Sequence, residues 1–420
     1  MKYITQKEQN ELLERFLRYV KIYTTSNAEK ADKGIQPSEE REFDLAKLLA
    51  EELKNLGLID VQITEHCYVY GAFPASTGLE KIPPYCLIAH MDTAGEVTGK
   101  NVKPQIIENY DGKILKLNCG VTLDPATDKA LLLAAQEKDT IITTDGTTLL
   151  GADDKAGIAE IITCLAYLKT HSEIKHSKIE VIFSPDEETG HGMDNVPLKL
   201  LTSKRAYTVD GGHIGELEDE CFNAWKSDIT FTGHSVHTGS AREGGLVNAV
   251  TMAASFVANL PRQEAPETTD KIQGFYAPME ITGSIEESHI MLLLRDFTLD
   301  GIEKRKNFIS SLAELTAQSF GGKVKVVHTQ QYLNMKEKLN EQPEVVEDLF
   351  KAYKLSDVTP VNIPIRGGTD GSRLTEMGIP TPNIFTGGHN YHSRSEWASL
   401  TQMAAAADIL INLAVIIGGK

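Results

Sequence analysis

The chain has 420 residues, more than one hydrophobic core usually organises, so we expect one large domain and one smaller domain. Its hydrophobic fraction of 41% and charged fraction of 24% are ordinary for a globular protein and argue against disorder. A formal net charge of -17 would repel phosphate backbones and anionic lipid surfaces. Nucleic acid and membranes are therefore poor candidates as partners, whereas small ligands and metal cations fit.

Three features bear on the compartment in which the protein works. The five cysteines are odd in number, widely spread and never arranged as a CxxC pair, which favours a reducing environment. The first residues, MKYITQKEQNELLERFL, lack the apolar core and cleavage site of a secretory signal. The apolar segment 404–420 is short and interrupted by Asp408 and Asn412, so it predicts a buried helix rather than a membrane span. We expect a cytoplasmic protein.

Apolar periodicity predicts that strands and helices alternate in the first half of the chain. Two helices come first, around 12–20 and 43–53. Three short apolar runs then have the character of buried strands, at 85–90, 178–184 and 205–209. Residues 156–168 carry apolar side chains on one helical face between the first two of these strands. This alternation predicts a mixed, mostly parallel α/β sheet covered by helices.

From about residue 225 the order of elements changes. The pattern becomes strand, helix, two strands, helix and strand, expected at 227–233, 246–260, 275–283, 289–297, 300–319 and 323–329. This is the βαββαβ order of a split-βαβ, or ferredoxin-like, α+β domain. A helix at 343–353 and short strands follow it. The sequence thus predicts an inserted domain at 223–334 within a discontinuous domain made of 1–222 and 335–420.

Acidic residues and histidines follow the predicted strands at the ends where open parallel sheets bind ligands. They are His90, Asp92, Asp153, Asp154, Glu187, Glu188, Asp210 and, later in the chain, His392. If the fold brings them together, these carboxylates repel one another unless cations neutralise them, and His, Asp and Glu without Cys suit catalytic zinc or manganese. A metal pair is the simplest explanation. Taken singly, each aspartate has an ordinary explanation as a helix cap, and the adjacent glutamates as a solvated loop.

Six motifs distributed along the chain carry a resemblance to a known family: HMDT, LLGADDKAGIAEI, SPDEETGHG, TVDGG, IRGGTDG and GGHNYH. They resemble the peptidase T family of tripeptide aminopeptidases and, more distantly, the dinuclear zinc exopeptidases and deacylases that include carnosinase and aminoacylase. The motifs HExxH and GxSxG and a complete Walker A motif are absent. Their absence argues against single-zinc HExxH proteases, nucleophile-elbow serine hydrolases and nucleoside triphosphatases.

The resemblance implies two zinc ions per subunit, with Mn²⁺ or Co²⁺ as possible substitutes. It implies that His90, Asp153 and Asp210 hold one ion. The other ion would be held by Glu188, His392 and the shared Asp153, which bridges the pair.

The resemblance also implies two carboxylates that act beside the metal ions. Asp92 would lie behind His90 and orient its ring, as ligating histidines usually require. Glu187 would be the general base that takes a proton from the water bound between the metals and then protonates the leaving amine. As an isolated residue, Asp92 could equally be a capping residue.

Three residues are expected to recognise the substrate. His237 matches the inserted-domain histidine that reaches the oxyanion of the reaction in the family, often from the partner subunit. Arg295 and Arg366 would hold the peptide carboxylate, because guanidinium offers paired donors of matching geometry. Either arginine could instead form a structural ion pair, and a lone loop histidine is ordinarily a surface residue.

The resemblance therefore predicts a metallo-aminopeptidase that releases the N-terminal residue from tripeptides through a bridging zinc-bound hydroxide. We expect a homodimer formed through the inserted lid domain. A related dinuclear zinc dipeptidase or N-acyl amino acid deacylase is the alternative enzyme. A non-catalytic metal-binding relative is a third reading, and the presence of Glu187 argues against it, because a metal store needs no general base.

Overall fold

The computed structural model describes all residues, Met1–Lys420, and divides the chain into two units. The first unit comprises Met1–Asp219, Glu337–Ile363 and Thr369–Lys420, and the second comprises Glu220–Lys336 and Pro364–Gly368. The predicted insertion, 223–334, lies within the main segment of the second unit. The short segment Pro364–Gly368, which the prediction assigned to the other domain, groups with the second unit.

The contacts of Arg366 explain why this short segment groups with the second unit. Its guanidinium donates to the backbone oxygens of Lys271 and Gln273, both at 2.9 Å, and to the Oγ1 atom of Thr269 at 2.8 Å. It also lies over the ring of Phe222, 5.2 Å from the ring centroid. Hydrophobic periodicity carries no signal for such contacts between distant segments.

The first unit is built on an eight-stranded sheet with the strand order β1-β2-β8-β3-β9-β16-β10-β15. Its strands are β1 (Ile59–Ile63), β2 (Val69–Phe73), β3 (Tyr85–His90), β8 (Ile179–Ser184), β9 (Ala206–Gly211), β10 (Glu216–Glu218), β15 (Val361–Asn362) and β16 (Asn383–Phe385). β3 runs parallel to both β8 and β9, and β9 runs parallel to β16. Antiparallel pairs occur where β2 meets β1 and β8, and where β10 meets β16. The predicted mixed, mostly parallel sheet is confirmed.

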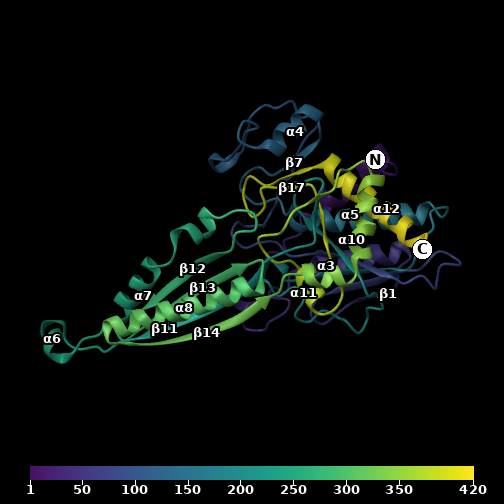
Figure 1. The fold of residues 1–420 in the computed structure, drawn as a ribbon. Helices are drawn as coiled ribbons and strands as arrows, with labels where there is room; N and C mark the ends of the chain where they lie inside the picture. Colours follow the sequence, from purple (N-terminus) through teal and green to yellow (C-terminus); the bar gives the residue numbers. More distant parts are fainter. The chain divides into compact units, whose positions relative to one another are not determined.

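Helices cover this sheet, as Figure 1 shows. Those of the first unit are α1 (Gln6–Tyr19), α2 (Ala28–Ala31), α3 (Glu42–Leu56), α4 (Lys129–Glu137), α5 (Ala152–Thr170), α9 (Lys336–Glu341, which crosses the unit boundary), α10 (Pro343–Leu355), α11 (Asp370–Glu376) and α12 (Leu400–Gly418). α5 packs against β3 and β9, and α1 and α12 pack against α5. On the sheet itself, Cys86 and Ile88 of β3 pack with Leu374 of α11.

Helix α12 is long and apolar enough to cross a bilayer by length and composition. However, 83% of its apolar window is buried inside the protein. Its interior position accounts for the nearly continuous apolar sequence, because α12 packs against α1, α5 and α10. The prediction of a buried terminal helix is confirmed.

Two small sheets complete the first unit. One has the order β17-β18-β7-β4, and the other pairs β5 with β6. The strands are β4 (Gln105–Ile107), β5 (Leu115–Lys116), β6 (Thr122–Leu123), β7 (Ile141–Thr143), β17 (Gly388–His389) and β18 (Trp397–Ser399). Each has three residues or fewer, too few for a period to be recognised in the sequence. The pairing of β7 with β18 places the segment before β18 beside the segment after β7.

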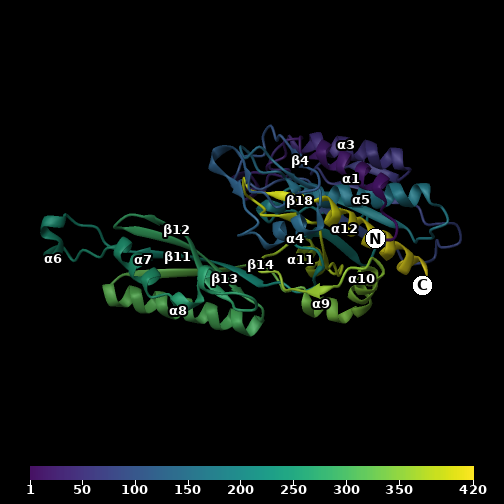
Figure 2. The same cartoon turned by 90° about the horizontal axis from the view of Figure 1, so that it is seen from above.

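The second unit has the predicted βαββαβ order. Its main elements are β11 (Asn223–Thr232), α7 (Ala249–Ala258), β12 (Phe275–Gly283), β13 (Glu287–Asp296), α8 (Leu299–Phe320) and β14 (Lys323–Tyr332). The strands form an antiparallel sheet in the order β12-β13-β11-β14. Its buried core joins Ile229 and Phe231 of β11 to Phe256 of α7 and Ile309 of α8. Figure 2 shows α8 running along this sheet.

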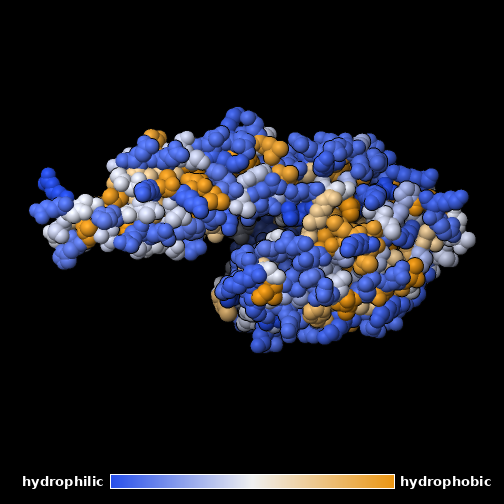
Figure 3. All heavy atoms as spheres, turned by 90° about the horizontal axis from the view of Figure 1, so that it is seen from below, coloured by the Kyte–Doolittle hydropathy of each residue, from blue (hydrophilic) through white to orange (hydrophobic).

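The surface is mostly hydrophilic on the face drawn in Figure 3, in keeping with the net charge. Strand β12 is an exception within the second unit. Met279 and Ile281 are 60% and 52% exposed there. β12 is at the edge of its sheet and pairs only with β13, so it lacks a strand partner for the backbone groups on its outer side.

Candidate metal centre and active site

The candidate ligands are placed by the strand ends of the first unit. His90 is the last residue of β3, and the neighbouring strand β8 ends at Ser184, just before the turn that carries Glu187 and Glu188. Asp210 lies near the end of β9, on the other side of β3. The carboxyl ends of parallel strands meet at one edge of a sheet, so these residues converge there.

Five predicted ligands come together at this edge. The Nε2 atom of His90 lies 2.9 Å from Oδ1 of Asp153 and 3.5 Å from Oδ1 of Asp210. The Nε2 atom of His392 lies 3.3 Å from Oδ2 of Asp153 and 2.9 Å from Oε2 of Glu188. The two oxygens of Asp153 therefore face different histidines.

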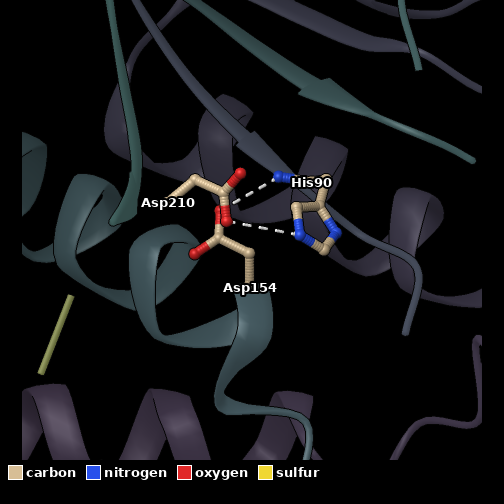
Figure 4. Close-up of side chains that lie close together, drawn as sticks. All are labelled: His90, Asp154 and Asp210. Carbon is tan, nitrogen blue, oxygen red and sulfur yellow. Dashed lines mark hydrogen bonds and ion pairs between the residues drawn. The ribbon is translucent and has the colours of Figure 1, made fainter. Parts of the chain in front are cut away.

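Asp154 also lies in this cluster. Figure 4 shows its carboxyl group beside that of Asp210, next to His90, and ligand atoms of these three residues lie within 4.8 Å of one another. The Asp154 carboxylate already accepts two backbone hydrogen bonds, from the N–H of His90 at 3.1 Å and from that of Gly157 at 3.2 Å. Asp154 thereby ties the first turn of α5 to the end of β3.

Asp92 lies behind His90, where the sequence analysis expected it. Its backbone oxygen is 3.2 Å and its Oδ1 atom 3.3 Å from Nδ1 of the His90 ring. The same carboxylate accepts hydrogen bonds from the backbone N–H groups of Glu187 at 3.0 Å and Glu188 at 3.2 Å. One fully buried side chain thus contacts both the His90 ring and the turn that carries the two glutamates.

Glu396 is a buried site residue that the sequence analysis missed. Its carboxylate accepts hydrogen bonds from four successive backbone N–H groups, those of Leu150 (2.6 Å), Gly151 (2.9 Å), Ala152 (2.7 Å) and Asp153 (3.3 Å). Burial nevertheless raises the pKa of Glu396 to about 7. The only sequence signal was an acidic residue a few positions after His392, in SRSEW.

Asp370 was also missed, although the motif IRGGTDG contains it. It is the first residue of α11 and is buried, and the Oγ atom of Ser184 donates a hydrogen bond to its carboxylate. Burial raises the pKa of Asp370 to about 7. Its negative charge also contributes to raising the pKa of Glu187, after burial and the charge of Asp210.

The electrostatics of the cluster show an excess of buried negative charge. Burial, reinforced by the charge of Asp153, raises the pKa of Glu188 to about 8. Burial likewise raises the pKa of Asp210 to about 6. Burial would also raise the pKa of Asp153, but hydrogen bonds with His392 and His90 outweigh it and lower that pKa.

The donor set fits divalent metal ions. Two imidazoles and three carboxylates, with no thiolate, are the ligand types of catalytic zinc sites, and manganese accepts the same oxygen and nitrogen donors. The Oε1 atom of Glu188 is buried and accepts no hydrogen bond within the chain. A buried carboxylate oxygen without a partner is costly, and a bound cation supplies the missing partner.

The three predicted substrate residues all belong to the second unit. His237 is exposed, and its Nδ1 atom accepts a hydrogen bond from the backbone N–H of Gly239 at 3.1 Å. Arg295 is 9% exposed, and its guanidinium donates to the backbone oxygens of Leu294 at 3.0 Å and Trp225 at 3.2 Å. Neither Arg295 nor Arg366 forms an ion pair with a carboxylate of the chain. Neither residue therefore makes the structural ion pair that was the alternative to binding the substrate.

A cavity of about 700 Å³ lies in the first unit beside the segment that carries His392. Its lining is largely polar and includes His213, Asn390 and Tyr391. The Tyr391 hydroxyl donates to the backbone oxygen of Gly211, the residue directly after Asp210, at 3.1 Å. The cavity volume is within the usual range for sites that bind small molecules.

Comparison with known proteins identifies the family. The family model described as "Peptidase family M20/M25/M40" matches residues 142–415, which span the second unit and most of the candidate ligands. The chain belongs to this peptidase family. Membership confirms the predicted resemblance and the enzyme class, a metallopeptidase.

Individual relatives are similar to this chain over nearly its whole length. The chain is 44% identical to the peptidase T of Clostridium perfringens strain 13, over 97% of this chain and 99% of that one. The solved structure of a tripeptidase from Staphylococcus aureus Mu50 is similar, with a TM-score of 0.78 at 22% identity, covering 98% of this chain and 99% of that one.

A third relative is described as binding metal. The YXEP protein of Bacillus subtilis is described as a dinuclear metal binding peptidase of the M20 family. Its structure gives a TM-score of 0.67 at 14% identity, covering 98% of this chain and 99% of that one. At such identities the two structural matches establish the shared fold, and the roles of individual residues have to be argued from this chain.

Proposed function

We propose that this chain is a zinc-dependent aminopeptidase that releases the N-terminal residue from tripeptides. Its family membership and its similarity to peptidase T support the activity. The observation that carries the proposal is the position of Asp153, with one oxygen toward His90 and the other toward His392. A carboxylate in this position suits a bridge between two metal ions.

In this proposal two zinc ions bind per subunit, and Mn²⁺ or Co²⁺ can substitute. His90, Asp153 and Asp210 hold one ion, and Glu188, His392 and Asp153 hold the other. The paired distances support this division, because Asp210 pairs with His90, Glu188 pairs with His392, and Asp153 pairs with both histidines. Ligand atoms of His90, Asp153 and Glu188 also lie within 4.8 Å of one another, so the two groups adjoin.

Asp154 is assigned a positioning role instead. Both of its carboxylate oxygens are already engaged, one by the N–H of His90 and the other by the N–H of Gly157. Asp92 has a comparable role, because it fixes the ring of His90 and the backbone of Glu187. Such partners behind metal ligands commonly tune affinity and activity by about 10–100-fold.

Glu187 is the proposed general base and acid. When bound, a metal pair lowers the pKa of water and polarises the scissile carbonyl. The Glu187 carboxylate accepts the proton, and burial together with the charge of Asp210 raises its pKa, so that it holds the proton long enough to pass it to the leaving amine. The hydrogen bond from its backbone to Asp92 keeps Glu187 beside the ligand cluster.

The second unit supplies substrate recognition in this proposal. His237 donates to the oxyanion that forms during attack on the peptide bond. Arg295 binds the carboxylate of the peptide, a role supported by its burial without an acidic partner in the chain. Arg366 is proposed for the same role; its guanidinium donates to Lys271, Gln273 and Thr269, as that of Arg295 donates to Leu294 and Trp225.

We further propose a cytoplasmic homodimer. Five free cysteines are consistent with a reducing compartment. The edge strand β12, with Met279 and Ile281 exposed, supports association of two chains through their second units. Short peptides are the proposed substrates, and nucleic acid and membranes are not proposed as partners.

The test is product analysis with zinc-loaded protein and a panel of di-, tri- and tetrapeptides together with an N-acylated amino acid. The expected result is release of the first residue from tripeptides, with little turnover of the other compounds. Cleavage of the N-acylated compound without tripeptide cleavage would assign the chain to deacylases. Cleavage of dipeptides alone would make it a dipeptidase, and no turnover of any compound would indicate a non-catalytic relative.

A further inference from the structure

The backbone around the start of α5 presents four N–H groups to a single carboxylate. Regular helical geometry is interrupted here, since Gly151, directly before α5, has φ +83°, and Asp153, the second residue of α5, has ψ 104°. The N–H groups of Leu150 to Asp153 therefore have no place in a regular hydrogen-bond ladder, and in a buried segment they need other partners. The Glu396 carboxylate accepts all four bonds and is only 1% exposed.

The backbone of Glu396 is fixed by its neighbours. It directly precedes β18, where Trp397 is registered with Thr143 of β7. The Oγ1 atom of Thr143 donates to the backbone oxygen of Glu396 at 2.8 Å. The carboxylate therefore projects from a fixed backbone onto the Leu150–Asp153 segment.

This arrangement joins the two segments that carry Asp153 and His392. Glu396 follows His392 by four residues, and its carboxylate bonds directly to the N–H of Asp153. Glu396 therefore connects the two segments whose side chains meet where Asp153 Oδ2 lies 3.3 Å from His392 Nε2. A simple helix cap needs no such link between the segments that carry two candidate ligands.

We infer that Glu396 is a positioning residue of the metal centre: it fixes the Leu150–Asp153 backbone so that the two Asp153 oxygens point toward His90 and His392. The inference rests on the proposed function, because it takes Asp153 to be a metal ligand. It assigns the role to hydrogen bonds from the protein backbone and requires no contact between Glu396 and a metal ion.

The first unit contains a matched control. Glu180 is also completely buried, and its carboxylate accepts backbone N–H bonds from Thr202 at 3.0 Å and Ser203 at 2.8 Å. It lies near the start of β8, four residues before Ser184, or about 13 Å away at the usual rise of a strand. E180Q therefore makes the same chemical change at another buried carboxylate that accepts backbone N–H bonds, away from the metal ligands. Glu180 also pairs with Lys178 at 2.7 Å, so E180Q removes an ion pair as well and is the more severe control for stability.

The experiment is a zinc titration of metal-free wild type, E396Q and E180Q against a chromophoric chelator, together with thermal unfolding of each metal-free protein. In E396Q, an NH₂ group faces backbone N–H groups and cannot accept their bonds. We expect the zinc affinity of E396Q to fall by about 10–100-fold, as for other residues that orient metal ligands. E180Q should unfold at a lower temperature but keep the wild-type zinc affinity.

A variant with a shorter side chain guards against a folding failure. E396D keeps the charge but cannot reach all four N–H groups, so it should lose less affinity than E396Q, and it carries the test alone if E396Q does not fold. Wild-type affinity in the folded Glu396 variants, or an equal loss in E180Q, would overturn the inference while leaving the proposed function standing. Wild type that binds no zinc would overturn both.

Discussion

The carboxyl-end edge of the eight-stranded sheet and the interior of the second unit differ in whether their buried charged side chains are neutralised by partners of opposite charge. At the sheet edge, burial raises the pKa of Glu188 to about 8 and that of Asp210 to about 6. In the second unit, the mostly buried Arg305 is paired with Asp296 at 3.1 Å and Glu264 at 2.8 Å.

This difference distinguishes residues that stabilise the fold from residues that serve binding or catalysis. The second unit has an apolar core, the main source of stability in a fold, and its buried Arg305 is neutralised by carboxylates. The sheet edge gathers carboxylates whose ionised forms are unfavourable without a cation, a pattern typical of functional sites. Substitutions at the edge should therefore change metal binding and turnover more than folding.

The largest effect is expected for D153N, which removes the proposed bridge between the metals. We expect turnover of a tripeptide to fall by at least about 10³-fold, as for loss of a central catalytic group. Zinc content measured on the purified variant should fall as well. The control is D348N, which breaks the buried ion pair with Arg205 in the same unit and should lower the unfolding temperature without loss of zinc.

E187Q should have the next largest effect. Without a carboxylate to move the proton, turnover should fall by about 10²–10⁴-fold, while the two zinc ions remain bound. Steady-state kinetics and metal analysis on the same preparation separate the two properties. Wild-type turnover in E187Q would remove Glu187 from the mechanism, and loss of zinc would make it a ligand.

A smaller effect is expected in the second unit from R295Q. Loss of a charge-assisted bond to the substrate carboxylate should raise KM for tripeptides by about 10–100-fold, with a smaller change in kcat. Arg305 provides the matched control, since it is similarly buried but already paired with carboxylates. An equal rise of KM in R305Q would show that the effect reflects damage to the unit rather than substrate binding.

The smallest effect concerns the pH dependence of stability in the metal-free protein. The pKa of Glu188 is raised by burial from 4.5 to about 8, so the folded state favours its protonated form. The contribution of Glu188 to the free energy of unfolding is then fully present below about pH 4.5 and is lost as the pH rises through about 8. Thermal unfolding of metal-free wild type should show this decline, and E188Q should show less of it. An unfolding temperature that rises over this range in both proteins would contradict the assignment.

Long elements and chemically distinctive motifs made much of this molecule predictable. The strands at 85–90, 178–184 and 205–209 are continuous apolar runs, and they became the neighbouring strands β3, β8 and β9. Because their carboxyl ends share one edge, the convergence of His90 and Asp210 followed from the sheet alone. Asp153 was a candidate from its place before the predicted helix at 156–168, and the ligand roles of Asp153 and His392 came from the resemblance.

The missed features depend on contacts between distant parts of the chain. Glu396 meets residues 150–153 only because β18 and β7 pair, and strands of three residues carry no readable period. The grouping of Arg366 with the second unit depends on bonds to the backbone of Lys271 and Gln273. Neither kind of contact has a local sequence pattern.

The most direct test of the central claim is a zinc titration of metal-free protein that follows release of the N-terminal residue from a tripeptide. The account predicts that activity rises with occupancy and saturates at two zinc ions per chain. Full activity in the presence of a strong chelator would contradict it, as would saturation at a single ion.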